Sequence, residues 1–280
     1  MKTYLDCIPC FFKQALEAAR MVTNDKEKQH EILNRVAREL PRFSLNGAPA
    51  EIGSVVYKIV HEITGDSDPY KKVKEKYNRI ALSLYPKLKQ EIERSTDRLL
   101  TAVRIAIAGN IIDFVVGAKF DVEKELQKTL TCKFAIFDYE DFKKLAEQAE
   151  NILYLADNAG ETVFDRVLIE ELDKKVTYAV KEAPIINDAT IEDAKFCRID
   201  KIAKVISNGS DAPGTILSLC SKEFLTYYNQ ADLIISKGQG NYETLSEEKR
   251  PIFFLLKAKC PIIAQDIGVP EGSIILMKGH

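Results

Sequence analysis

The sequence lacks tryptophan altogether and contains only three histidines in 280 residues. With so few imidazoles, one of them the C-terminal His280, no Ser-His-Asp or Cys-His catalytic arrangement is evident. No stretch approaches the ~20 consecutive apolar residues that a membrane-spanning helix needs. Lysine and arginine (40) nearly balance aspartate and glutamate (42), and the net charge of −2 gives no general attraction to nucleic acids or anionic membranes. We therefore expect neither nucleic-acid nor membrane binding.

The N-terminus, Met1 to Asp6, lacks the apolar core of a secretion signal, so we expect a cytoplasmic protein. Four of the six cysteines lie far apart and are expected to be buried thiols: Cys132, Cys197, Cys220 and Cys260.

The other two cysteines form the motif Cys7-Ile8-Pro9-Cys10. A zinc site would need a second pair or histidines at ligand spacing, and a thioredoxin-like motif would follow a strand, which six preceding residues do not provide. Two thiols at the start of a helix are the simpler interpretation of Cys7 and Cys10. A redox, metal or disulfide role is the alternative.

The first half of the chain has mostly helical periodicity, with apolar faces over 32–40 and 52–63. A long helix should follow Tyr70, and Pro86 should kink or break it. The predicted helix over 95–116 is strongly apolar yet contains Asn110 and Asp113, which share one face. On such a helix an amide and a carboxylate must be capped, paired or directed at a ligand.

From residue 151 onward short apolar runs alternate with helical patterns, which predicts an α/β protein with a parallel sheet. The predicted strands cover 134–137, 151–156, 175–180, 202–207, 233–236, 252–256, 262–264 and 273–277.

Polar turns follow four of these strands. In a parallel sheet the carboxyl ends of the strands share one edge, so these turns should meet in one cleft. The candidate substrate- and phosphate-binding residues among them are Glu161, Lys181, Ser207, Asn208, Lys237, Gly238 and Gly240.

The residue types indicate metal and phosphate chemistry. Asp157, Asn158 and Asp188 supply hard oxygen ligands, which suit a divalent ion such as Mg, Mn, Co or Ni. Lys237 precedes Gly238 and Gly240, which together resemble a phosphate cradle, although no GK[ST] of a P-loop occurs. No GxGxxG follows the first of the central strands, so a dinucleotide-binding protein is disfavoured.

Five motifs in this order resemble the DUF89 family of damage-control phosphatases, in particular an archaeal branch with an N-terminal CxxC. These motifs are Cys7-x-x-Cys10, Ala108-Gly-Asn-Ile-Ile-Asp113, Asp157-Asn-Ala-Gly-Glu161, Asn187-Asp188-Ala-Thr and Lys237-Gly-Gln-Gly-Asn-Tyr-Glu243.

The resemblance implies an all-helical domain (1–133) packed on a three-layer α/β/α, Rossmann-like domain (134–280), with the site between them. It implies a divalent metal held by Asp157, Asn158 and Asp188, and hydrolysis of small phosphometabolites such as sugar phosphates, in clearance of damaged or excess metabolites. It also associates Lys237 with the phosphate and directs Asn110 and Asp113 toward the cleft.

Either a metal-activated water or a carboxylate nucleophile, with Asp157 the candidate, would attack the phosphorus. Two other functions stay open: an S-adenosylmethionine-dependent carboxyl methyltransferase, and a metal- or metabolite-binding protein without turnover. The apolar helix faces of the first half can pack internally or on a second subunit, so the sequence predicts no oligomeric state.

Overall fold

Seven short apolar strands form one sheet in the order β1-β7-β6-β5-β2-β3-β4. The structure, a computed structural model, describes residues 1–110 and 122–280. All neighbouring strands are parallel except β6 and β7. The strands are β1 (Phe134–Phe137), β2 (Ile152–Leu155), β3 (Val176–Val180), β4 (Lys204–Ser207), β5 (Leu233–Lys237), β6 (Ile252–Lys257) and β7 (Ile274–Lys278). Strands β2, β3 and β5 are buried along their whole length, as expected where helices cover both faces of a parallel sheet.

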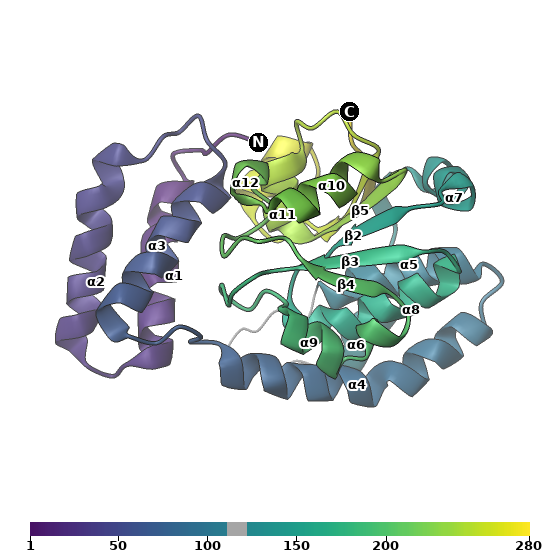
Figure 1. Cartoon of the computed structure of the whole chain (residues 1–280), viewed down its shortest axis with the longest axis horizontal. Coiled ribbons are helices and arrows are strands. Elements are labelled where there is room, and N and C mark those ends of the chain that lie inside the picture. The colour runs from purple at the N-terminus through teal and green to yellow at the C-terminus, as the bar shows by residue number, and fades with distance from the viewer. Residues whose placement is uncertain (111–121) are drawn as a thin grey trace.

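Helices cover the two faces of the sheet, as Figure 1 shows. On one face Leu153 and Ile234 pack with Phe224 and other apolar residues of α10 (Lys222–Gln230), α11 (Gly238–Leu245) and α12 (Pro261–Ile267). On the other face Tyr154 and Ile235 pack in a core shared with α7 (Tyr139–Gln148), α8 (Thr162–Leu172) and α9 (Ile191–Phe196). The alternation of strand residues between the two cores is the period of a β-strand. The predicted three-layer α/β/α fold is confirmed.

Three further helices from the first half, α4 (Lys71–Glu93), α5 (Arg98–Gly109) and α6 (Val122–Thr131), belong to this second layer. Helix α5 lies close against α8 because Gly109 has no side chain: a Cβ there would stand 2.9 Å from Cβ of Phe164. The predicted domain boundary at residue 133 stays a prediction, but α4, α5 and α6 share their hydrophobic core with the sheet.

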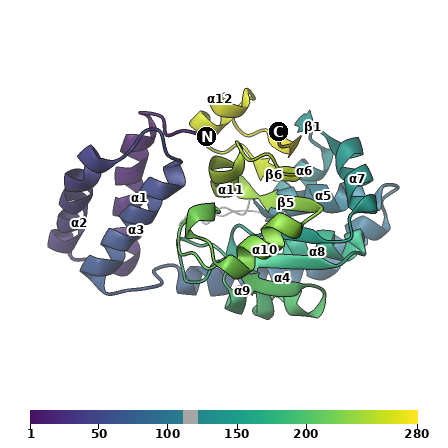
Figure 2. The same cartoon turned by 45° about the horizontal axis from the view of Figure 1, so that its top comes forward.

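The first three helices, α1 (Cys7–Val22), α2 (Lys26–Glu39) and α3 (Pro49–Thr64), form a bundle with a core of its own. Figures 1 and 2 show this bundle at one end of the molecule. Apolar residues at helical spacing, such as Ile32 and Val36 of α2, build the core. One buried member, Ile185, comes from the turn after β3, so the bundle is attached to the sheet through that turn.

The structure corrects one predicted strand and refines two predicted helices. Residues 262–264 lie in α12 and not in a strand, because Pro261 occupies the first turn of a helix, where its missing N–H costs no hydrogen bond. Helix α4 continues through Pro86 to Glu93, so of the two predicted effects of Pro86 the break does not occur. Helix α5 ends at Gly109 with Asn110 as its C-cap, and Asp113 lies outside the described residues. Among the described residues, no helix is long and apolar enough to cross a membrane.

Candidate functional site

The predicted meeting of polar turns follows directly from the strand register. Leu155 at the end of β2 pairs with Ala179 of β3 and Ser236 of β5, while Val180 pairs with Ser207 of β4. The four strands therefore end at the same level, and their turns share the carboxyl edge of the sheet.

Two amides and two carboxylates form the centre of this edge. The side-chain amide of Asn110 donates to Oδ2 of Asp157 (2.7 Å) and to Oε1 of Glu161 (2.9 Å). The amide of Asn158 donates to the same two oxygens, at 3.0 and 2.6 Å. Asn110 comes from the end of α5, so a helix of the first half contributes to the site, as the sequence analysis expected.

Asp157 lies in an acidic environment. It keeps a partly exposed surface, yet burial raises its pKa well above the usual range, and the neighbouring charges of Glu161 and Asp188 raise it further. The charges of Glu161 and Asp188 repel that of Asp157 in these partly desolvated surroundings, and a cation relieves that repulsion. The arrangement is therefore suited to holding a positive ion.

Lys237 is placed differently from the prediction of a phosphate cradle. Its ammonium is 0% exposed and lies 2.9 Å from Glu161 Oε2 and 2.6 Å from Asp165 Oδ1. Burial by itself would lower the pKa of Lys237, but the charges of Asp165 and Glu161 raise it above the usual value. Lys237 is thus permanently charged and held by two carboxylates.

Asp165 completes this buried network. It accepts hydrogen bonds from the hydroxyls of Tyr154 (2.7 Å) and Tyr178 (2.8 Å), which point from β2 and β3 to the same face of the sheet. The sequence analysis missed Asp165. The sequence feature that could have identified Asp165 is its i, i+4 spacing from Glu161 at the start of α8, which places both carboxylates on one helical face.

Gly238 allows the backbone to pass directly over Asp157. Its φ of +76° is unfavourable for other residues, and a Cβ at this position would stand 1.9 Å from Oδ2 of Asp157. The glycine after Lys237 is therefore required by the approach of β5 to the carboxylate.

Asp188 lies beside Asn158, and the two residues form an isolated antiparallel bridge. Burial raises the pKa of Asp188 to about 6, although the ammonium of Lys181, 3.5 Å from Oδ2, opposes this increase. Lys181 also donates to the carbonyl of Gly214 in the turn after β4. The three predicted metal ligands are thus on adjacent turns, and Lys181 lies next to them.

The turn that holds Asp188 is strained and anchored. Ile186 has a φ of +48°, which is rare for a β-branched residue. Its neighbour Ile185 lies in the core of the α1–α3 bundle. From that bundle, Tyr57 faces the same turn: burial raises its pKa well above the usual value, and Tyr70 and Asp188 add to the increase.

Several predicted residues make their contacts elsewhere. The Ser207 hydroxyl accepts from Gly209 N (2.8 Å), and Asn208 Oδ1 accepts from Ser210 N (2.9 Å), so both shape the turn after β4. Gly240 lies against Gly214: a Cβ added to Gly240 would stand 3.2 Å from the backbone nitrogen of Gly214.

The Cys7-x-x-Cys10 motif occupies the first turn of α1, and both thiols are free. Burial raises the pKa of Cys7, and Glu243 and Cys260 add to the increase, so its thiol is protonated and weakly nucleophilic at neutral pH. The role of the Cys7–Cys10 pair stays a prediction.

The turn after β6 also reaches the site, and the sequence analysis passed over it. Its Lys259 donates a backbone N–H to Oε1 of Gln239 (2.7 Å) in the first turn of α11. Burial is the main cause of the raised pKa of Asp157, and the positive charge of Lys259 opposes it. Lys259 is only partly buried. The sequence feature that could have pointed to Lys259 is its position in Lys257-Ala-Lys259, immediately after a predicted strand of the same sheet.

The donor set fits a hard divalent cation. The described residues contain no cluster of three or more His, Cys, Asp or Glu side chains that could hold a metal ion. The candidate set reaches three ligands only because it combines two carboxylates, Asp157 and Asp188, with the amide oxygen of Asn158. Carboxylate and amide oxygens are the ligands of Mg²⁺ and similar ions, and the acidic surroundings of Asp157 favour a cation.

Fold and site together define a doubly covered α/β protein with an acidic, oxygen-rich site at the carboxyl edge of its sheet. Residues 3–275 match the Damage-control phosphatase ARMT1-like domain, and the chain belongs to this family.

Two archaeal relatives match nearly the whole chain. Damage-control phosphatase PH1575 of Pyrococcus horikoshii is 39% identical, over 99% of this chain and 98% of that protein. A damage-control phosphatase of Archaeoglobus fulgidus is 37% identical, over 96% of each chain. The crystal structure of the Pyrococcus DUF89 family protein superimposes with a TM-score of 0.92 over 100% of both chains. The predicted family is confirmed.

Proposed function

We propose that this protein is a divalent-metal-dependent phosphatase that hydrolyses phosphomonoesters of small metabolites in metabolite damage control. The names of the two archaeal relatives support the reaction class. The observation that supports the metal dependence is the repulsion that Glu161 and Asp188 exert on Asp157, with Asn158 in contact with both Asp157 and Asp188, at the carboxyl edge of the sheet.

In this proposal Asp157, Asn158 and Asp188 hold the metal ion. The ion would supply Lewis-acid stabilisation of a phosphate oxygen and of the attacking oxygen. The amides of Asn110 and Asn158 hold Asp157 and Glu161 in fixed orientations, so the oxygen ligands are in place before any substrate enters.

The two lysines near the site have different proposed roles. Lys237 has no exposed surface and binds two carboxylates, which favours a positioning role: it keeps Glu161 ionised, and Glu161 fixes the amides of Asn110 and Asn158. Although burial alone would raise the pKa of Glu161, the charge of Lys237 lowers it below its usual value. We assign to Lys259, which is partly buried and whose charge acts on Asp157 and Glu161, the neutralisation of charge on a phosphoryl group, together with the backbone N–H of Gly238 beside Asp157.

The test measures phosphate release from an aryl phosphate by metal-stripped protein, with Mg²⁺, Mn²⁺, Co²⁺ or Ni²⁺ added back one at a time. We expect activity only with metal, and its loss in Asp157→Asn and Asp188→Asn. Asp141→Asn, which removes an exposed carboxylate paired with Lys278, is the matched control and should retain full activity. Metal-loaded, folded protein that releases no phosphate from any ester would refute the proposal, as would full activity in both site variants.

The lysine assignment is tested separately. Lys259→Gln should raise KM and weaken inhibition by inorganic phosphate while leaving the unfolding transition almost unchanged. Lys237→Gln should instead lower the stability of the fold. If instead Lys237→Gln raised KM without a loss of stability and Lys259→Gln left KM unchanged, the phosphate-binding role would belong to Lys237.

A further inference from the structure

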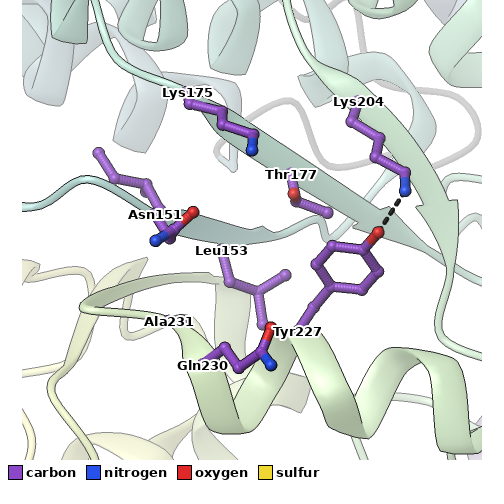
Figure 3. A pocket seen from close by; sticks show the side chains of 9 residues that line it. Asn151, Leu153, Lys175, Thr177, Lys204, Tyr227, Gln230 and Ala231 are labelled. Carbon is purple, nitrogen blue, oxygen red and sulfur yellow. Dashed lines mark hydrogen bonds between the residues drawn. The ribbon is translucent and has the colours of Figure 1, made fainter.

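A cavity of about 200 Å³ lies at the amino-terminal edge of the sheet, opposite the site described above. It is bordered by the first residues of β2, β3 and β4 and by the last turn of α10, as Figure 3 shows. Its lining residues are Asn151, Ile152, Leu153, Lys175, Thr177, Lys204, Tyr227, Gln230 and Ala231.

The cavity has an apolar floor and a polar rim. The floor consists of the buried residues Ile152, Leu153 and Ala231. At the mouth lie two exposed lysines, Lys175 and Lys204. In Figure 3 Lys204 extends from β4 toward the hydroxyl of Tyr227, and Lys175 lies just before β3 on the same side of the lining. Lys204 donates to the hydroxyl of Tyr227, and its ammonium lies 4.7 Å from the centroid of that ring. Tyr227 thereby fixes one of the two cations at the rim.

The electrostatic balance of the cavity is positive. Two lysines line it, and none of its lining residues is acidic. The ammonium of Lys175 forms no ion pair or hydrogen bond within the part of the chain that the structure describes. Two acidic groups act close to the lining: Asp232, whose carboxylate accepts from the backbone of Glu150 and Asn151, and Glu223, whose charge acts on Lys204.

The end of α10 would ordinarily oppose an anion, because its last carbonyls give a helix C-terminus a partial negative charge. Here the guanidinium of Arg250 donates to the carbonyls of Tyr228 (3.0 Å), Asn229 (2.9 Å) and Ala231 (3.0 Å). Arg250 therefore neutralises these carbonyls from outside the cavity, and the charges of Lys175 and Lys204 dominate within it.

We propose that this cavity is a second binding site, separate from the phosphatase site, for a small organic anion with a phosphate or carboxylate group. The anionic group would lie between Lys175 and Lys204, and an apolar or hydroxylated part would lie on Leu153 and the ring of Tyr227. A cavity of about 150 Å³ accommodates benzene, so the volume of this one suits a ligand of only a few carbons and one anionic group. Drug-sized ligands use larger pockets.

The experiment uses lysine acetylation, read by mass spectrometry, because it reports on this cavity and not on the phosphatase site. The full chain is labelled in inorganic phosphate or in malonate, at constant ionic strength set with chloride. At an anion concentration about ten times Kd, labelling of Lys175 and Lys204 should fall about tenfold. Lys174 and Lys201, their neighbours in sequence outside the lining, are the internal controls and should label at an unchanged rate.

A second measurement removes the site. Lys175→Gln combined with Lys204→Gln should abolish the increase in Tm that the anion gives to metal-free protein, while basal phosphatase activity stays at the wild-type level. Protection by phosphate alone would define a phosphate site, and protection by both anions a general small-anion site. Equal labelling of all four lysines with and without anion, or a Tm increase that persists in the double variant, would overturn the proposal.

Discussion

The two edges of the sheet hold their charges in opposite ways. At the carboxyl edge the charged groups are buried and tied to fixed partners: Lys237 binds Glu161 and Asp165, and Asn110 and Asn158 bind Asp157. At the amino edge Lys175 and Lys204 are exposed, and only Lys204 has a defined partner in the cavity, Tyr227. In our two proposals one sheet supports two kinds of site, a preorganised one for chemistry and a looser one for binding.

The difference also predicts how each edge responds to mutation. Buried charges that lose a partner are costly, because the partner left behind is still desolvated. Removing the partner of an exposed charge changes the free energy of unfolding little, because water replaces the partner. The following expectations are ordered from the largest effect to the smallest.

The largest effect is expected from Asp157→Asn, which keeps the shape of the side chain and removes its charge. Hydrolysis should fall by about a thousandfold or more, since metal ions contribute several kcal/mol to such reactions. Stability should be equal or higher, because the repulsion from Glu161 and Asp188 disappears. Steady-state kinetics and thermal unfolding of the same preparation measure both. A variant that loses stability along with activity would contradict the view that Asp157 is held in place at a cost to the fold.

Lys237→Met should lower the free energy of unfolding by about 3–5 kcal/mol, because Glu161 and Asp165 are then buried without a counter-charge. Denaturant unfolding measures the change. The matched control is Lys278→Met, which breaks an exposed pair with Asp141 and should cost less than about 1 kcal/mol. Similar losses of unfolding free energy in the two variants would contradict the expectation that a buried ion pair costs more to break than an exposed one.

Glu243, on α11 near the carboxyl edge, should give the stability a pH dependence. Burial raises its pKa to about 7, against the opposing effects of the N-terminal ammonium and a backbone N–H. The folded protein then binds more protons than the unfolded chain between about pH 4.5 and 7, so this carboxyl contributes stability at low pH that is lost as the pH rises.

Glu243→Gln should remove this loss of stability with rising pH. For a pKa raised from 4.5 to about 7, the free energy of unfolding falls by about 3 kcal/mol between pH 4.5 and 8. Unfolding measured at several pH values provides the comparison, with Glu247→Gln, an exposed residue of the following turn, as control. A parallel pH dependence in wild type and Glu243→Gln would show that the carboxyl is better solvated than its position indicates.

The smallest effect is expected at the amino edge. Lys175→Gln and Lys204→Gln, together, should change the free energy of unfolding by no more than about 0.5 kcal/mol in the absence of anions. Denaturant unfolding in chloride buffer tests this. A loss of several kcal/mol would mean that the Lys204–Tyr227 contact is part of the fold and not of a binding site.

The sequence predicted the sheet and the position of the site because both depend on local patterns. Apolar runs of strand length predicted each strand among residues 1–110 and 122–280, and the polar residues after them marked one edge. The run 262–264 failed because three apolar residues fit a short helix as well as a strand, and Pro261 decided between them.

The partners within the site were harder to predict. The sequence assigned Lys237 to the phosphate from its neighbouring glycines, but burial and pairing with Asp165 depend on how α8 packs against β5, which no local pattern reveals. Lys259, to which we assign the phosphate, was not singled out for a related reason: its position near the site depends on β6 lying next to β5, a fact of strand order and not of spacing.

The anchored turn after β3 has a consequence for the evolution of this family member. Ile185 is fixed in the core of the α1–α3 bundle, and Asp188 is fixed beside Asn158. The three residue steps between them span at most about 10 Å, so neither end can move without the other. Loops elsewhere on the surface tolerate insertions and deletions. Here a change of length would displace either the bundle or the proposed metal ligand Asp188, so the length of this turn should be preserved while its other residues vary.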